Sequence, residues 1–183
     1  PEEGRRLAVE KVDEIKKRLS DGTKMLFITA GMGGGTGTGA APVIAKISKE
    51  MGILTIAVVT QPFRDEGTEF LRRAYEGIQE LSKNVDSLLI IDNQKIYDIY
   101  GDLDIWDAFP KADAVLQTAI KGIAEIITGH GYINVDFADV RRVMKDSGMA
   151  IMGSGEASGA NRAEIAVERA FTSPLIKDYS LKS

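Results

Sequence analysis

The residues that most clearly suggest chemistry lie between Gly31 and Gly39, a segment of nine residues with six glycines and two threonines. An apolar run, residues 24–30, precedes this segment, and a helical pattern, residues 40–51, follows it. A glycine-rich turn between a strand and a helix N-terminus offers backbone N–H groups to an anion, and the helix dipole favours negative charge there. The hydroxyls of Thr36 and Thr38 add further donors. The segment predicts a phosphate site; the alternative is a tight turn that binds nothing.

Two common phosphate loops fit this segment poorly. No lysine follows the glycines, so the pattern G-x-x-x-x-G-K-[ST] is absent. The stretch Gly35–Ala40 satisfies the permissive dinucleotide pattern G-x-G-x-x-[G/A]. That pattern calls for an acidic residue at the end of the next strand, but the next apolar run ends at Thr60 and Gln61. A dinucleotide-dependent oxidoreductase is therefore the weaker alternative.

A second group of candidate residues is the pair of carboxylates Asp136 and Asp139, which follows Asn134 at the start of a predicted helix. Because residues three apart in a helix share one face, the two carboxylates lie on the same side of the helix. They are therefore a candidate catalytic pair. The spacing fits a structural role equally well. In that case Asn134 or Asp136 caps the helix, and Asp139 complements its dipole.

Composition limits the class of protein. The chain has 183 residues, a hydrophobic share of 44%, a charged share of 27%, a net charge of −4 and no cysteine. These totals are ordinary for a globular domain. The mildly acidic charge and the lack of a basic block argue against nucleic acid as a partner. The lack of cysteine excludes disulfides and thiolate metal sites. No apolar run reaches the roughly 18 residues of a membrane span.

Helical patterns alternate with apolar runs along most of the chain. This order predicts an α/β fold, a Rossmann-like parallel sheet flanked by helices. The stretch 104–128 is predicted as one long helix. The other predicted helices are 5–19, 40–51, 67–84, 133–146 (a loop running into a helix) and 161–174, and the predicted strands are 24–30, 53–60, 87–93 and 149–159, the last running into a second glycine loop.

Three ordered motifs resemble the tubulin/FtsZ superfamily, and within it the bacterial cell-division GTPases of the FtsZ type. They are "GGGTGTGAAP" at 33–42, "GILTIAVVTQPF" at 52–63 and "NVDFADVRRVM" at 134–144. The resemblance implies a tubulin-like GTPase that binds GTP or GDP with Mg²⁺ and polymerises head to tail. It also implies a cytoplasmic protein at the mid-cell division ring, with membrane tethers and regulators as partners but neither nucleic-acid binding nor membrane insertion of its own.

The resemblance also implies roles for individual residues. Glu66 matches a residue near the ribose, Asn93 matches a guanine contact, and Phe109 and Asp113 match residues that stack near the base and hydrogen-bond it. Asn134, Asp136 and Asp139 match residues that orient and polarise the attacking water. No side chain is predicted to hold a metal. The matched phosphate contacts are Gly33, Gly34, Gly35, Thr36, Gly37 and Thr38.

One residue departs from the family pattern. Relatives often carry an arginine four residues after the matching glutamate, and this chain has Phe70 there, with Arg72 and Arg73 just beyond. Either a neighbouring arginine replaces the missing one, or that phosphate or sugar contact is lost.

The predicted long helix separates the two halves of the implied site. From Asp113 to Thr128, fifteen residues at about 1.5 Å each carry the chain roughly 22 Å away. The acidic pair lies beyond that end, so we expect it to reach the nucleotide of the next subunit in a head-to-tail filament.

The resemblance divides the chain into residues 1–103, part of a GTP-binding domain, 104–128, the central helix, and 129–183, the catalytic loop and the start of a C-terminal subdomain. It also implies that a strand and a nucleotide loop precede Pro1 and that the rest of the subdomain follows Ser183. We expect the isolated chain to be weakly active or inactive. A further alternative is a module that only binds or caps filaments of a complete relative.

Overall fold

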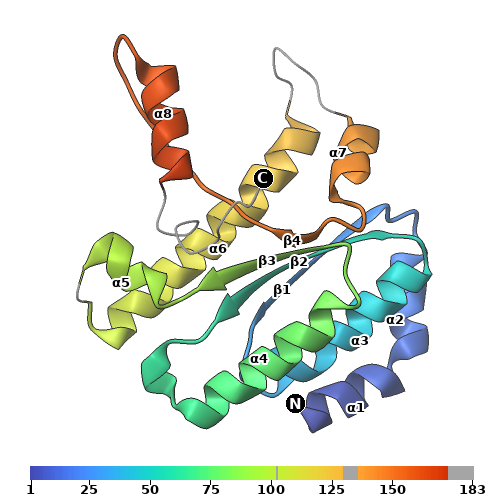
Figure 1. Ribbon diagram of the computed structural model, residues 1–183. Helices are drawn as coiled ribbons and strands as arrows, with labels where there is room; N and C mark the ends of the chain where they lie inside the picture. Colours follow the sequence, from blue (N-terminus) through green and yellow to red (C-terminus); the bar gives the residue numbers. More distant parts are fainter. Residues whose placement is uncertain (102, 130–135, 173–183) are drawn as a thin grey trace.

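A four-stranded parallel sheet forms the centre of the molecule (Figure 1). The computed structural model describes residues 1–101, 103–129 and 136–172. The strands lie side by side in sequence order, with Met25 of the first opposite Leu54 of the second and Ile56 of the second opposite Ser87 of the third. The predicted parallel α/β fold is confirmed. The strands are β1 (Met25–Gly31), β2 (Leu54–Gln61), β3 (Ser87–Asp92) and β4 (Gly148–Ala150).

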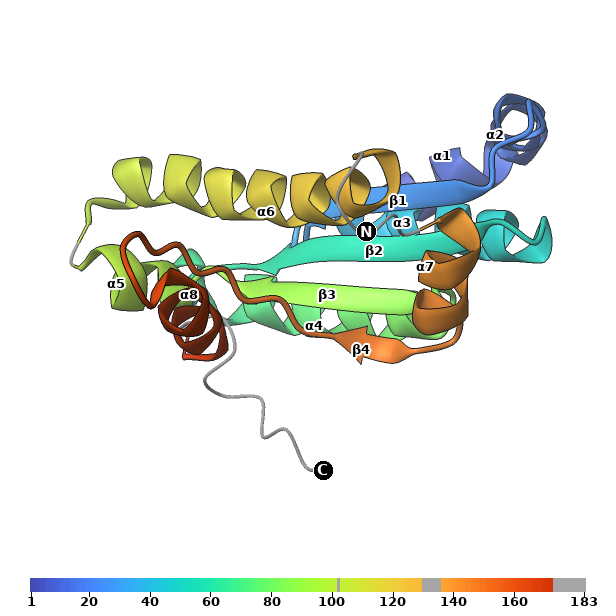
Figure 2. The same ribbon diagram turned by 90° about the horizontal axis from the view of Figure 1, so that it is seen from above.

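The sheet is buried on both faces, as expected for strands that read as continuous apolar runs. Ala57 and Val59 of β2 pack toward α3 (Thr36–Glu50) and α4 (Thr68–Ser82). The alternate residues Ile56 and Val58 belong to the core under α6 (Ile105–Thr128). Figure 1 shows α6 on one side of the sheet and α3 and α4 on the other, and Figure 2 looks onto the sheet from the side of α6. The long helix predicted at 104–128 is confirmed, and Asp104 caps it by accepting the N–H of Trp106 at 3.0 Å.

The N-terminal segment forms two helices, so the prediction of one helix over 5–19 is wrong. Helix α1 (Glu2–Glu10) and helix α2 (Val12–Leu19) are separated at Lys11, whose φ of −105° and ψ of 16° leave the helical region. Both helices lie on the outer side of α3 (Figure 1). The apolar spacing of 5–19 continues through Lys11, so it gave no sign of the break.

Two other elements differ in their bounds from the prediction, and two were not predicted. Helix α3 begins at Thr36, inside the glycine segment, because Gly37 and Gly39 take helical positions. The last strand is confined to Gly148–Ala150 and does not extend through 149–159. The elements not predicted are the 3₁₀ turn η1 (Arg64–Glu66) and the six-residue helix α5 (Lys95–Tyr100), because both are too short to show a helical period. Helices α7 (Phe137–Met144) and α8 (Arg162–Phe171) lie within the predicted ranges.

Within residues 1–101, 103–129 and 136–172, no helix is both long and apolar enough to cross a membrane.

Candidate functional site

A pocket of about 240 Å³ opens where β1, β2 and β3 end. Five of the residues singled out from the sequence line it, although they lie far apart in the chain. The carboxyl ends of parallel strands meet at one edge of the sheet, and ligands of open α/β folds bind there. The lining residues are Gly31, Met32, Gly34, Thr60, Pro62, Glu66, Phe70, Asn93, Phe109, Ala112, Asp113 and Leu116.

The glycines next to this pocket serve two different purposes. A Cβ added at Gly34 or Gly35 meets no atom within 4 Å, so a ligand can approach the backbone there. A Cβ at Gly39 would overlap the carbonyl oxygen of Pro1, and one at Gly37 would lie 2.7 Å from that of Gly31. Gly34 and Gly35 leave room for an anion at the N-terminus of α3, whereas Gly37 and Gly39 allow close packing of the backbone.

Gly33 and Thr38 form a brace inside the glycine loop. The N–H of Gly33 donates to Oγ1 of Thr38 at 2.8 Å, and both residues are buried. Gly33 has a φ of +111°, which side chains other than glycine rarely adopt. The Gly33 amide is therefore already occupied. The phosphate contacts predicted for Gly33 and Thr38 remain predictions, and the exposed Thr36 is the freer hydroxyl of the two threonines.

Asn93 lies directly after β3 and is 5% exposed. Its N–H donates to the carbonyl oxygen of Gln61 at 3.0 Å, which ties it to the end of β2. Its side-chain Oδ1 has no hydrogen-bond partner among the described residues. A buried acceptor without a partner is costly, so this atom is suited to accept from a ligand in the pocket.

An aromatic cluster holds Phe109 in the wall of the pocket. The ring of Phe63, fully buried, meets Phe109 edge-on at 5.2 Å and Tyr97 at 5.4 Å. Phe109 itself is 38% exposed, and Asp113, one turn further along α6, is exposed. An aromatic ring and an exposed carboxylate therefore line the pocket one helical turn apart.

Glu66 is held in place at the pocket margin. Its Oε1 accepts the N–H of Phe63 at 2.8 Å, and the residue is half-buried at the end of η1. Glu66 is therefore not a freely solvated loop carboxylate. One carboxylate oxygen secures the loop and the other can accept from a hydroxyl of a ligand.

The pocket lining carries no lysine or arginine among the described residues. Arg72 bonds Glu69 at 2.6 Å and Glu76 at 2.5 Å, and these bonds raise its pKa. Arg73 lies 3.3 Å from the same Glu69. Neither arginine lines the pocket, so of the two alternatives for Phe70 the structure favours a lost contact.

The acidic pair lies at the other edge of the sheet. Asp136 caps α7 by accepting the N–H of Asp139 at 2.9 Å, and Asp139 accepts the N–H of Asp136 at 3.4 Å. The capping interpretation of Asp136 is confirmed, and the second carboxylate oxygen of each of these exposed residues has no hydrogen-bond partner among the described residues. The catalytic role remains a prediction. Asn134 lies outside the described residues.

Helix α7 is fixed at the start of β2, where Nη2 of Arg141 donates to the carbonyl oxygen of Gly52 at 3.2 Å. The pocket lies at the end of the same strand, next to Thr60. Seven residue steps along β2, from Leu54 to Gln61, span about 23 Å. Figure 1 shows α7 at the end of the sheet where the strands begin and α5 at the end toward which the arrowheads point. The two acids thus lie at the end of the sheet where the strands begin, and the pocket lies at the end where the strands terminate.

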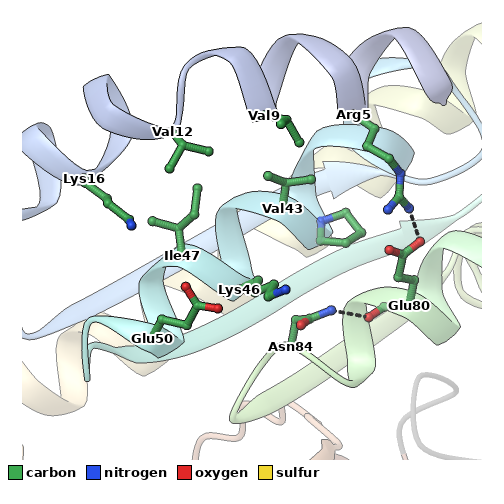
Figure 3. Close-up of a pocket in the computed structure, with 11 residues that line it drawn as sticks. Arg5, Val9, Val12, Lys16, Val43, Lys46, Ile47, Glu50, Glu80 and Asn84 are labelled. Atoms are coloured by element: carbon green, nitrogen blue, oxygen red, sulfur yellow. Dashed lines mark hydrogen bonds and ion pairs between the residues drawn. The ribbon is translucent and has the colours of Figure 1, made fainter.

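A larger hollow of about 440 Å³ lies on the outer side of α3 (Figure 3). Its floor is apolar, with Val9, Val12, Val43 and Ile47, and an ion pair of Arg5 with Glu80 stands at one end. None of the residues predicted for the site lines it, and no glycine amide opens into it. Its size alone therefore does not make it the functional site.

The sequence reasoning gave no role to Met32, Pro62, Ala112 and Leu116 of the pocket, and it named Phe70 only as a departure from the family pattern. A Cβ at Gly33 would overlap the ring of Phe70, so the ring lies directly on the loop. The sequence placed Phe70 on an amphipathic helix, where an aromatic residue is ordinary. Only its spacing from Glu66 distinguished it.

Comparison with known proteins agrees with this geometry. The sequence model described as "Tubulin/FtsZ family, GTPase domain" matches residues 1–101, more than half of the chain. The chain belongs to the tubulin/FtsZ family. Within the family, it is similar to the cell division protein FtsZ of Pseudomonas putida, with 55% identity over 183 residues that cover all of this chain and 46% of that protein. The FtsZ of Wigglesworthia glossinidia brevipalpis is also 55% identical, over residues that cover 99% of this chain and 47% of that protein.

Solved structures of the family share the fold. An FtsZ dimer of M. jannaschii, described as empty, superposes with a TM-score of 0.91 and 48% identity over 96% of this chain and 51% of that one. A CetZ of Methanosaeta thermophila, 22% identical with a TM-score of 0.74, shows the fold alone. The chain spans about half the length of the curated relatives that it matches.

Proposed function

We propose that this chain forms the nucleotide-binding core of an FtsZ-type GTPase that stacks head to tail into filaments. The observation that carries the proposal is the convergence of Gly34, Glu66, Asn93, Phe109 and Asp113 on one pocket at the carboxyl edge of the sheet. Membership of a family whose matching domain is described as a GTPase domain supports it.

Guanine fits the hydrogen-bonding groups of the pocket better than adenine does. A carboxylate accepts only, so Asp113 can pair with the N1–H and N2–H₂ edge of guanine, whereas adenine presents an acceptor at N1. The unpaired Oδ1 of Asn93 needs a donor, which the same base supplies. Phe109 offers a ring on which the base can stack.

The phosphates of the nucleotide fit the N-terminus of α3. Its first N–H groups have no acceptor inside the helix, and Gly34 and Gly35 leave open space in front of them. Among the described residues, no cluster of three or more acidic, histidine or cysteine side chains could hold a metal. Mg²⁺ would enter with the nucleotide and would offset the charge of its phosphates.

Hydrolysis requires a second copy of the chain in this proposal. The acids lie about 23 Å of strand away from the pocket of their own chain, as estimated from the rise of β2. In a head-to-tail stack they face the nucleotide of the next copy. The free oxygens of Asp136 and Asp139 then hold the attacking water in line with the γ-phosphate, where the loose transition state requires positioning more than covalent chemistry. A contact of this heterologous kind generates filaments.

A nucleotide titration tests the choice of guanine. Trp106, the single tryptophan of the chain, is 80% exposed in the first turn of α6 and three residues before Phe109. We expect GDP and GTP to change its fluorescence at lower concentrations than ATP or NAD. Asn93→Ala is expected to weaken guanine binding without lowering the unfolding temperature, since it removes an unpaired buried oxygen. Equal responses to GTP and ATP would contradict the proposal.

A mixing experiment tests the shared site. Added to the complete P. putida relative, the wild-type chain can present its acids to the relative's nucleotide, whereas the Asp136→Asn chain presents an impaired pair. We expect different GTP turnover in the two mixtures at equal concentrations. Identical turnover over a range of concentrations would contradict hydrolysis between copies.

The same relatives support a proposal for the cellular setting. Two of them are named cell division proteins, and one solved relative is an FtsZ dimer. We propose that the intact protein acts in the cytoplasm at the mid-cell division ring, with itself as its main partner. Membrane tethers and division regulators are the further partners proposed.

A further inference from the structure

Phe70 occupies a position where the glycine loop and the pocket meet. It belongs to the first turn of α4, and its N–H donates to the carbonyl oxygen of Gly67 at 3.1 Å. Its ring is half-buried, covers Gly33 and lines the pocket together with Gly34 and Glu66. A ligand whose phosphates lie at the open glycines must therefore pass next to this ring.

The charges around Phe70 leave this part of the pocket without a side-chain cation. The lining contains two carboxylates, Glu66 and Asp113, and no lysine or arginine among the described residues. The nearest basic residues on α4 are Arg72 and Arg73, and both are paired with Glu69. Among the described residues, anion recognition here depends on backbone N–H groups and the hydroxyl of Thr36, without help from a basic side chain.

We propose that Phe70 is a specificity-determining residue, which makes the pocket recognise the guanosine part of the ligand more than its phosphates. The ring covers Gly33 and supplies apolar surface where a cation would pair with phosphate. Aromatic surface gains from contact with a sugar or base and gains nothing from an additional phosphate charge. This inference rests on the proposed guanine-nucleotide site and adds to it which part of the ligand carries the affinity.

The proposed role of Phe70 is tested by replacing its aromatic ring with a positively charged side chain. Affinities for guanosine, GDP and GTP are measured by calorimetry on the wild-type chain and on Phe70→Arg, at one salt concentration. Arginine pairs strongly with phosphate. We expect Phe70→Arg to tighten GDP and GTP on the order of tenfold and to change guanosine less than about threefold.

Two further variants make the result specific. Phe70→Leu keeps an apolar side chain, so we expect the ratio of GDP to guanosine affinity to stay at the wild-type value. Phe70→Lys carries the same charge on a different stem and replaces Phe70→Arg if the latter lowers the unfolding temperature. For Phe70→Lys we expect the ratio to shift in the same direction as for Phe70→Arg.

The possible outcomes separate this inference from the proposed function. If the wild-type chain binds guanosine and GDP but both charged variants keep its affinity ratio, the inference about Phe70 is overturned and the guanine site stands. If the wild-type chain binds no guanine compound, the proposed function itself fails, and the inference fails with it.

Discussion

The amide of Gly33 and the hydroxyl of Thr38 join the two ends of the glycine loop through a buried hydrogen bond of 2.8 Å. This bond keeps Gly33 in its left-handed conformation while the residues between them remain open to solvent. The loop thus has a fixed shape even though it is rich in glycine.

Thr38→Val tests this brace. The substitution keeps the shape of the side chain and leaves the buried N–H of Gly33 without an acceptor. We expect a loss of about 1–3 kcal/mol in the free energy of unfolding, measured by urea denaturation. Thr38→Ser keeps the hydroxyl and is expected to lose clearly less. Equal losses for the two variants would show that the bond contributes little.

Gly39→Ala and Gly34→Ala form a matched pair that separates packing from binding. A methyl at Gly39 would overlap Pro1, and we expect that strain of about 1–3 kcal/mol to exceed the roughly 1 kcal/mol gained in helix propensity. A methyl at Gly34 meets open space, so we expect stability to change by less than about 0.5 kcal/mol. Nucleotide affinity, measured by calorimetry, should fall for Gly34→Ala. Unchanged affinity in that variant would place the phosphates elsewhere.

The variants Asp136→Asn and Asp136→Ala distinguish the role of Asp136 as a helix cap from its proposed role in GTP hydrolysis. Asparagine is as good a helix cap as aspartate, whereas alanine costs about 1 kcal/mol. We therefore expect thermal unfolding to be nearly unchanged for Asp136→Asn and earlier for Asp136→Ala. The proposed catalytic role predicts that both variants lose GTP turnover in filaments. If turnover followed stability, with only the alanine variant impaired, Asp136 would be a cap alone.

Asp146 predicts a dependence of stability on pH. The hydrogen bond from Lys49 at 3.0 Å lowers the pKa of the Asp146 carboxyl below its usual value. A lowered pKa in the folded state stabilises the protein above the unfolded pKa of about 3.9, and this contribution is lost as the pH falls through the folded pKa. Asp146→Asn, which tolerates the φ of 52°, should melt slightly earlier than the wild type at pH 7.

The measurement is a series of melting curves from pH 7 to pH 3. We expect the difference between the wild type and Asp146→Asn to shrink below about pH 4 and to shrink in high salt, because the pair is exposed. A difference that is independent of pH would exclude the ion pair as its cause.

Much of the fold could be predicted from the sequence because the strands are continuous apolar runs. The strand predicted at 87–93 is observed at Ser87–Asp92, and the helix predicted at 67–84 is observed at Thr68–Ser82. The break at Lys11 could not be predicted, since the apolar spacing runs through it. The start of α3 was missed because glycines usually indicate a loop, whereas Gly37 and Gly39 are inside the helix to allow close packing.

The candidate site, like the fold, could be predicted from the sequence only in part. The glycine segment alone predicted an anion site at a helix start, and the structure provides an open helix start there. Asn93, Phe109 and Asp113 could be assigned only through the family resemblance, because local pattern does not show which distant residues meet at one sheet edge. Their roles toward a nucleotide stay predictions. Phe70 was identified only as a departure from the arginine of the family pattern. Its contact with Gly33 could not be predicted, because that contact depends on how α4 packs.

The absence of lysine and arginine from the described pocket lining has a kinetic consequence. Glu66 and Asp113 give the entrance a negative field that opposes an approaching polyphosphate. Dissolved ions screen such a field over about 10 Å at 0.1 M. The association rate of a free nucleotide should therefore rise with ionic strength, opposite to the behaviour of an entrance that attracts polyphosphates through basic side chains.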